Sequence, residues 1–266
     1  MVARDFKMSV ELKEYMAPRV DTRESCEPAR QPRVLCVAPA WNEGERIARV
    51  VRAVPDSVET TVVVDDGSTD DTADHAERAG ATVVRSGGNR GVGAAIRSGI
   101  DYAIEHGYDI VVIVSGGGKT PPEQIPRLLE PIIKGEAEFA QGSRYLQGGE
   151  HLRMPWRRKL GTRGYTFLFS LFCGRRVTDA SSGFRAFKVS LFDDKRINLW
   201  QDWLDRYDLE PYLLFKSLRH RHKVVEVPVT IEYPKTDGIA YTKMKAFTDW
   251  WKIFRPIIFL ALGIKR

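Results

Sequence analysis

The feature that most constrains the fold is a regular alternation of apolar runs and helix-like segments that begins at Arg33. In the segment 42–54, apolar residues recur at Ile47, Val50 and Val51 with the spacing of one helix face. The run 109–115 is apolar without alternation, which predicts a strand buried on both faces. Expected strands lie at 34–40, 60–68, 81–86, 109–115, 137–144 and 222–233, and expected helices at 42–54, 69–80, 91–107 and 121–135. This order predicts an α/β fold with a mostly parallel, doubly wound sheet and helices on both of its faces.

Three parts of the chain differ in composition. Residues 1–32 are polar and interrupted by prolines, which predicts an N-terminal tail, and residues 33–245 hold one large domain. Residues 246–266 form an amphipathic C-terminal segment. Its uninterrupted apolar run, 256–264, is much shorter than the roughly 20 residues that span a bilayer, so we expect it to lie on a membrane surface.

Charge and cysteine content indicate the kind of partner and the compartment. A formal charge of +6 and a pI near 9.2 favour an anionic partner such as a phosphate, a nucleotide or a lipid headgroup, and a nucleic acid is not expected. The cysteines Cys26, Cys36 and Cys173 are odd in number and show no metal-ligand spacing. With no signal peptide recognised, these features predict a cytoplasmic protein, peripheral at the inner face of the membrane.

Adjacent acids leave the second expected strand in "VVVDDGSTDDT", residues 62–72. Asp65 and Asp66 either cap the turn that follows or accept hydrogen bonds from a nucleobase or ribose at the carboxyl edge of the sheet. Both interpretations stay open on these residues alone.

Five short motifs occur together in a characteristic order: "PAWNE" (39–43), "DDGSTDDT" (65–72), "NRGVGAAIRSG" (89–99), "GSRY" (142–145) and "DASSGFR" (179–185). The set resembles the family 2 glycosyltransferases, and within them the polyprenyl-phosphate group typified by dolichol-phosphate mannose synthase. The resemblance implies a GT-A-type fold that binds a nucleotide-sugar donor and transfers the sugar with inversion. A Rossmann dehydrogenase is disfavoured because no GxGxxG follows the first strand.

The resemblance also implies roles for single residues of the donor site. Trp41 stands where the family commonly has a tyrosine, and its alternative is a plain core aromatic. The residues implied to hold the nucleoside are Pro39, Trp41, Glu43 and Asp65 or Asp66, and those implied to line the donor cleft are Asn89 and Gly93.

The chain departs from the family in "VVIVSGGGKTPPEQIP", residues 111–126. Where relatives have an Asp-x-Asp segment and a glutamine that hold Mg²⁺ or Mn²⁺, this chain has Ser115, Gly117 and Lys119. Hard divalent cations prefer carboxylate oxygens, so we expect no firmly bound metal here. Three interpretations remain: Lys119 replaces the cation at the diphosphate, the chain is a non-catalytic relative, or Mg²⁺ or Mn²⁺ binds weakly through the diphosphate and distant acids. We favour the first because the other donor motifs are intact, although Lys119 could also be an ordinary exposed lysine.

On the acceptor side, the resemblance places Asp179 and Arg185 near the end of the cleft. The planar fork of Arg185 suits two phosphate oxygens, and its alternative is a surface position beside a tight turn. Glu210, or else Asp208, would be the base if the acceptor is a hydroxyl, whereas a phosphate acceptor needs none.

Basic segments complete the pattern at 153–163, where aromatic residues are interleaved, and at 174–176 and 219–223. The first suits a lipid-linked phosphate or an anionic membrane surface, and each could also be a solvated face. The segment 233–245 resembles the mobile segment of the family, and its Lys243 would close on the diphosphate. The sequence thus predicts an inverting glycosyltransferase acting on a polyprenyl phosphate at the membrane surface. The alternatives are a soluble small-molecule or nucleoside acceptor, and a sugar-nucleotide-binding protein without turnover.

Overall fold

The computed structural model describes residues 30–233 and 248–265 of the chain, without the side chains of residues 248–253. The chain forms two units, and the division lies after Gln31. All the described helices and strands belong to the second unit, which begins at Pro32.

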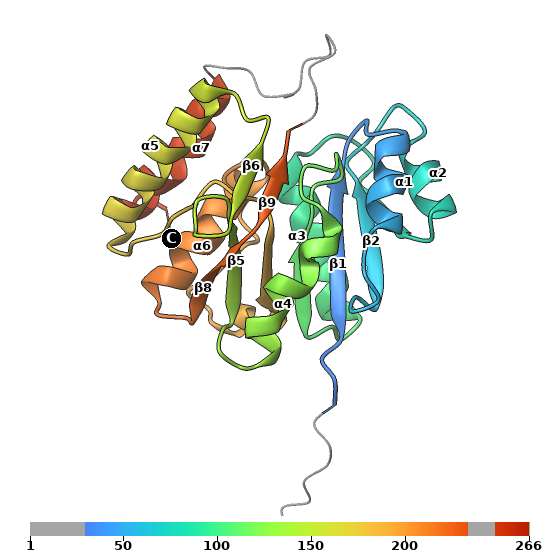
Figure 1. The fold of residues 1–266 in the computed structure, drawn as a ribbon, viewed down its shortest axis with the longest axis horizontal. Helices are drawn as coiled ribbons and strands as arrows, with labels where there is room; N and C mark the ends of the chain where they lie inside the picture. The colour runs from blue at the N-terminus through green and yellow to red at the C-terminus, as the bar shows by residue number, and fades with distance from the viewer. Residues whose placement is uncertain (1–29, 234–247, 266) are drawn as a thin grey trace, which may run out of the picture. The chain divides into compact units, whose positions relative to one another are not determined.

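A seven-stranded sheet forms the centre of this unit, in the order β3-β2-β1-β4-β7-β5-β8 (Figure 1). Six of its strands run parallel, and β7 is antiparallel to both neighbours, β4 and β5. The strands are β1 (Val34–Ala40), β2 (Thr60–Asp65), β3 (Thr82–Arg85), β4 (Ile110–Ile113), β5 (Phe139–Ser143), β7 (Arg185–Lys188) and β8 (Val224–Pro228).

Helices cover both faces of the sheet, as the sequence predicts. Along β1, Leu35 and Val37 belong to one hydrophobic core, whereas Val34 and Cys36 belong to the other, and all four are buried. The first core contains residues of α3 (Val92–Glu105), α5 (Trp156–Cys173), α6 (Leu209–Arg219) and α7 (Thr248–Ala261). The second contains residues of α1 (Glu45–Arg52), α2 (Thr72–Arg78) and α4 (Ile125–Ile133). Three short 3₁₀ helices, Pro122–Gln124, Val189–Asp193 and Asp202–Leu204, complete the described helices.

The expected single strand at 222–233 is wrong, because the chain divides it between two sheets. β8 pairs with β5 in the large sheet, and β9 (Thr230–Glu232) pairs with β6 (Glu150–Leu152) in a separate two-stranded sheet. The break lies at Pro228, which has no N–H to donate, and at Val229, which is fully buried between the two strands.

Helix α5 is the main element that the sequence pattern does not predict. Tyr165 and Phe169 are buried against the core, while Trp156 and Phe167 on the other side of the helix are more than two-thirds exposed. A helix with large apolar residues on both sides lacks the single apolar stripe by which amphipathic helices are recognised.

The C-terminal segment forms the helix α7, which packs against α5 and α6 (Figure 1). Ile257 is 2% exposed, and the Arg255 guanidinium is paired with the Asp208 carboxylate at the start of α6. This segment is therefore docked on the protein along at least one side. Within the described part of the chain, no helix combines the length and the apolar character needed to cross a bilayer.

Candidate active site

The carboxyl ends of β1, β2 and β4 lie at one edge of the sheet. Ala40 lies opposite Asp65 in the parallel register, and the Asp66 N–H donates to the Ala40 carbonyl at 2.9 Å. Ile113 lies opposite Val37, so the loop after β4 leaves the sheet beside the end of β1. The structure therefore brings together three of the expected donor segments, which we call the donor edge: residues 39–43, 65–68 and 114–120.

The two adjacent aspartates of the donor edge do different things. Asp66 accepts hydrogen bonds from the Arg90 N–H (2.8 Å) and the Gly91 N–H (2.7 Å), one on each carboxylate oxygen. It thereby fastens the β2 loop to the start of α3. Asp65 accepts one, from the Ser68 N–H at 3.0 Å, and its Oδ2 receives none from the residues that the structure describes. Asp65 is therefore the better candidate for a nucleoside contact.

Pro39 and Trp41 lie at the end of β1. The Pro39 carbonyl is covered by Gly116, since a Cβ at that glycine would come within 2.6 Å of the carbonyl oxygen. Trp41 is 38% exposed, so its indole is not a core aromatic and lies where a base could contact it.

Glu43 lies between the first and third segments of the donor edge. Its backbone N–H and that of Gly44 both donate to the Thr72 hydroxyl, at 2.8 and 2.9 Å, which fixes the loop. Its carboxylate lies against Gly117, because a Cβ there would come within 3.1 Å of Oε2. Glu43 and Gly117, two of the predicted donor-site residues, are thus close enough to contact each other.

Asn89 and Gly93 have different surroundings. Asn89 is exposed, and its backbone nitrogen lies close to Gly67 of the donor edge. A Cβ added at Gly67 would come within 2.7 Å of that nitrogen. Gly93 is buried, and a Cβ there would come within 2.0 Å of the Leu204 carbonyl oxygen. Instead of lining the donor cleft, Gly93 makes room for the backbone of residues 204–206.

The loop after β4 is a closed turn. The Gly118 N–H donates to the Ser115 carbonyl, and the Ser115 N–H donates to the Thr120 hydroxyl, both at 2.9 Å. The Lys119 carbonyl accepts from the Glu232 N–H at 3.0 Å, and the lysine is partly exposed. These bonds place Lys119 at the donor edge beside the β6–β9 sheet.

The loop 114–120 contains no carboxylate. Its residues therefore do not fit a divalent cation bound as by the Asp-x-Asp segment of the family. The loop offers the Ser115 hydroxyl and backbone carbonyls, and two of those carbonyls already accept hydrogen bonds. The Glu43 carboxylate, which lies against Gly117, is paired with Arg46 at 3.0 Å. Across residues 30–233 and 248–265, no three His, Cys, Asp or Glu side chains are grouped as metal ligands. The donor groups present at this loop therefore do not match the oxygen-rich ligand set of Mg²⁺ or Mn²⁺.

Asp179 lies on the acceptor side, which we define as the segments 179–185 and 202–210. It is fully buried and forms a bidentate ion pair with Arg144, with Nε and Nη2 at 2.7 and 2.8 Å from its two oxygens. Ser181 donates a further hydrogen bond from its hydroxyl at 2.9 Å. Burial alone would lower the pKa of Arg144, but the hydrogen bonds and charge of Asp179 outweigh it and raise the pKa above its ordinary value. Asp179 therefore positions the loop and Arg144, and its oxygens are already engaged.

Arg185 and Glu210 are neighbours in space, and Arg185 is the more deeply buried of the two. Arg185 is 1% exposed and donates to the carbonyls of Glu210 (2.7 Å) and Ser182, and its Nη2 lies 3.7 Å from Glu210 Oε1. Burial lowers the pKa of Arg185, and the charge of Glu210 opposes that shift. The Glu210 side chain is 21% exposed and lies over Gly183, where a Cβ would come within 2.7 Å of Oε1. In this arrangement Glu210 is accessible, whereas Arg185 supports it from inside and is neither a surface residue nor open to a ligand.

Asp208, the alternative to Glu210, is fully buried. Arg255 of α7 donates to its two carboxylate oxygens at 2.6 and 2.7 Å. Of the two acids, only Glu210 reaches solvent.

Segment 205–210 is held by three arginines from three elements: Arg97 of α3 pairs with Asp205, Arg255 of α7 with Asp208, and Arg185 of β7 with Glu210. This segment also contacts the start of α3, where the Ala94 N–H donates to the Asp205 carbonyl at 2.9 Å. The acceptor side is thus joined to α3, which begins at the donor edge, and to α7.

Sequence reasoning assigned no role to Arg144 or Tyr233. The Arg144 Nη1 lies 2.5 Å from the Tyr233 hydroxyl, which ties the "GSRY" motif to the end of β9. Arg144 directly follows the buried strand β5, and a buried guanidinium requires an acid to pair with. That requirement is the sequence signal that could have indicated the role of Arg144. Glu226 of β8 was also missed, and it accepts from the backbone N–H groups of Thr178 and Asp179 at 2.7 and 2.9 Å. Lys243 lies outside the described residues.

The comparison with known families agrees with this geometry. The model of the family described as "Glycosyl transferase family 2" matches residues 36–195. The chain belongs to glycosyl transferase family 2. It is 32% identical over 233 residues to an undecaprenyl-phosphate mannosyltransferase of Micrococcus luteus, covering 82% of this chain and 93% of that protein. It is 30% identical over 206 residues to a polyprenol monophosphomannose synthase of Mycolicibacterium smegmatis, covering 74% and 77%.

Solved structures show the same fold. A glucosyl-3-phosphoglycerate synthase of Mycobacterium tuberculosis superposes with a TM-score of 0.65 at 20% identity, covering 88% of this chain and 80% of that one. The expected GT-A fold and the expected glycosyltransferase family are therefore confirmed, and the protein is a glycosyltransferase.

Proposed function

We propose that this glycosyltransferase moves a sugar, with inversion, from a nucleotide-diphosphate donor to a polyprenyl phosphate at the cytoplasmic face of a membrane. The similarity to an undecaprenyl-phosphate mannosyltransferase of Micrococcus and to a polyprenol monophosphomannose synthase of Mycolicibacterium supports a polyprenyl-phosphate acceptor. The reduced, buried thiols of Cys36 and Cys173 support a cytoplasmic location.

The observation that carries this proposal is an exposed apolar stripe on α5, beside the acceptor side. Its members recur at the spacing of one helix face and are 64–69% exposed: Trp156, Leu160, Phe167 and Leu171. Four large exposed apolar side chains on one helix are costly in water and favourable in a lipid interface.

Basic side chains of the same helix lie over two tyrosines that contact Arg144, the partner of Asp179. The Arg163 guanidinium lies 5.1 Å from the centre of the Tyr145 ring, and that of Arg158 lies 5.3 Å from the Tyr233 ring. Arg144 lies beneath, between the same two tyrosines. A lipid lying along the stripe would therefore present its phosphate to arginines that are already positioned.

In the proposed reaction, a phosphate oxygen of the acceptor attacks the anomeric carbon of the sugar. The new C–O bond forms as the bond from that carbon to the donor diphosphate breaks, and the diphosphate leaves with the electron pair. Lys119, Lys243 and the N–H groups of the glycine loop would stabilise the charge that develops on the leaving group. The acceptor phosphate is already ionised, so no general base is required.

A second acceptor class, a soluble hydroxyl compound, is favoured by one observation. The carboxylate of Glu210 is accessible at the acceptor side, where a base would be needed, whereas Asp208 is buried and paired. Glu210→Gln should abolish transfer to a hydroxyl and leave transfer to a phosphate largely unchanged.

The test is to incubate the protein with a panel of nucleotide sugars and undecaprenyl phosphate in vesicles, and to detect sugar-linked lipid by mass spectrometry. A lipid product that requires the phosphate group supports the proposal. Sugar transfer to soluble acceptors with none to the lipid would contradict it, and donor binding without nucleotide release would indicate a protein without turnover.

Membrane contact can be tested on the stripe itself. Leu160→Gln with Phe167→Gln should reduce binding to vesicles, whereas Ile104→Gln, which changes an apolar side chain 44% exposed on α3, should not. Point variants are preferable to removal of α7, because that removal would leave Asp208 buried without Arg255. Equal vesicle binding by the double variant would exclude α5 as the membrane-contacting element.

A further inference from the structure

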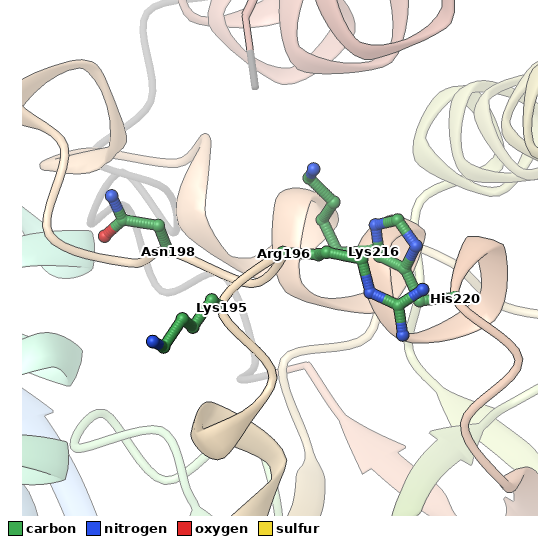
Figure 2. A pocket seen from close by; sticks show the side chains of 5 residues that line it. All are labelled: Lys195, Arg196, Asn198, Lys216 and His220. Carbon is green, nitrogen blue, oxygen red and sulfur yellow. The ribbon is translucent and has the colours of Figure 1, made fainter.

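A basic pocket lies at the far end of α6, outside the donor edge and the acceptor side. It has a volume of about 320 Å³. Its lining comes from the loop after the 3₁₀ helix Val189–Asp193 and from the end of α6 (Figure 2): Lys195, Arg196, Asn198, Lys216 and His220. Glu210 lies in the first turn of α6 and His220 follows its last residue, about 15 Å away at 1.5 Å per residue.

Positive charge in the basic pocket exceeds what the neighbouring acid can offset. Asp194 is the acid beside it, and both of its oxygens accept from Arg196, at 2.8 and 2.7 Å. Its Oδ2 also lies 3.1 Å from His222 Nε2. Within the described residues, neither Lys195 nor Lys216 forms an ion pair. At neutral pH the pocket therefore keeps about two uncompensated ammonium charges, against roughly half a negative charge from the end of the α6 dipole.

His220 adds an unused polar atom. Its Nε2 is buried and has no hydrogen-bond partner in the part of the chain that the structure describes. Burial lowers the pKa of His220, and the charges of Lys216 and Arg196 lower it further, opposed by Asp194. Burial likewise lowers the pKa of Lys216. Both shifts have the direction expected for cations that are partly removed from water, and the charge of Asp194 opposes each of them.

Basic residues from a third segment lie nearby. Arg175, which follows α5, and Arg219, at the end of α6, are both close enough to act on the pKa of the buried Cys173 thiol, which burial raises to about 11. The fold thus gathers the basic segments 174–176, 195–196 and 216–223 at one end of the helical layer, away from the donor edge.

We propose that the basic pocket binds a phosphate-bearing anion, with Lys216, His220 and Arg196 as its principal contacts. A phosphate group has several oxygens for separate donors, fits within the 320 Å³ pocket with room for the group that bears it, and would give His220 Nε2 an oxygen partner when that nitrogen is protonated. Because Lys216 and His220 lie on the helix whose first turn holds Glu210, an anion bound there would act on the same helix as the acceptor side. The ligand can be a free phosphate ester or the phosphate of a lipid headgroup, since the chemistry is shared.

The experiment uses the full chain and needs no glycosyl donor or acceptor, so it is independent of the proposed transfer reaction. Inorganic phosphate and pyrophosphate are titrated against chloride at equal ionic strength, with calorimetry and with NMR of the His220 ring. Phosphate should bind and raise the pKa of His220. Lys216→Gln with His220→Gln should weaken binding at least tenfold, and Lys216→Arg, which keeps the charge, should retain most of it.

A matched control removes the same residue types elsewhere. Lys134→Gln with His106→Gln changes an exposed lysine directly after α4 and an exposed histidine directly after α3, and should bind phosphate like the parent protein. Thermal unfolding of each variant verifies that the fold is intact.

A second arm separates the two sources of phosphate. Vesicles of phosphatidylglycerol and of phosphatidylcholine are compared with the pocket variant and the control variant. If free phosphate has no effect and only the pocket variant loses binding to phosphatidylglycerol, the ligand is a lipid headgroup. If neither form binds, or if the control variant loses as much as the pocket variant, the proposed site is wrong.

Discussion

The donor edge and the acceptor side use their acidic residues in opposite ways. At the donor edge, Asp66 accepts from two backbone N–H groups, and Asp65 from one. On the acceptor side, Asp179 and Asp208 are fully buried and each forms a bidentate pair with an arginine. One region is shaped by main-chain hydrogen bonds, and the other by ion pairs between distant segments.

This difference shows where each region can bind charge. The third segment of the donor edge holds Lys119 and glycines, which in the proposed reaction would offer a diphosphate an ammonium group and backbone donors. On the acceptor side, Asp179 and Asp208 are fully buried and paired with arginines, whereas the side chain of Glu210 is 21% exposed. Changes to the two regions should therefore affect stability and donor binding to different degrees.

The largest expected effect is on the acceptor side. Asp179→Ala would leave the Arg144 guanidinium buried and unpaired, and should lower the free energy of unfolding by about 3–5 kcal/mol. Urea denaturation measures this loss. Glu59→Gln, which breaks the exposed pair with Arg33, is the matched control and should cost less than about 1 kcal/mol. A similar loss in both variants would remove the distinction between buried and exposed pairs.

The pair that joins α7 to α6 should have a smaller effect. Arg255→Ala leaves Asp208 without its partner, but the arginine is 27% exposed and water can reach part of the site. We expect a loss of about 2–3 kcal/mol, below that of a wholly buried pair, from the same urea measurement. A loss under about 0.5 kcal/mol would show that α7 is not held by this contact.

At the donor edge, Asp66→Ala should cost about 1–3 kcal/mol, because the N–H groups of Arg90 and Gly91 would lose their acceptors. Amide hydrogen exchange at Gly91 should accelerate. Asp66→Asn keeps one acceptor oxygen and should lie between the parent protein and the alanine variant. Unchanged exchange at Gly91 in Asp66→Ala would contradict the assigned role.

Two glycine variants compare a packed glycine, where α3 meets residues 204–206, with a glycine on an open surface of α5. Gly93→Ala should destabilise by about 1–3 kcal/mol because its methyl group would overlap the Leu204 carbonyl. Gly164→Ala in α5 has nothing within 4 Å of the added carbon and should stabilise by about 0.5–1 kcal/mol. Thermal unfolding gives the sign of each change, and equal signs would contradict the packing assigned to Gly93.

The sequence predicted the sheet and its helices well because β1 and β4 are apolar throughout, β2 contains an apolar run at residues 62–64, and α1 has a clear apolar stripe. It missed α5, where the stripe Trp156 to Leu171 hides the helical period, and the division of 222–233 at Val229. The motif residues of the donor edge were brought together as expected. Pairing could not be predicted, because the partners Arg144 and Asp179, or Arg255 and Asp208, are far apart in sequence and meet only in the folded chain.

We propose that the donor edge binds a diphosphate through Lys119 and backbone donors in place of a metal. The most direct measurement is calorimetry with UDP and GDP in EDTA and with added Mn²⁺, for the parent protein, Lys119→Ala and Lys119→Gln. We predict that one nucleotide binds in EDTA with little change on adding Mn²⁺, and that both variants weaken its binding at least tenfold, about 1.4 kcal/mol. Binding that disappears in EDTA and survives Lys119→Ala would contradict the claim.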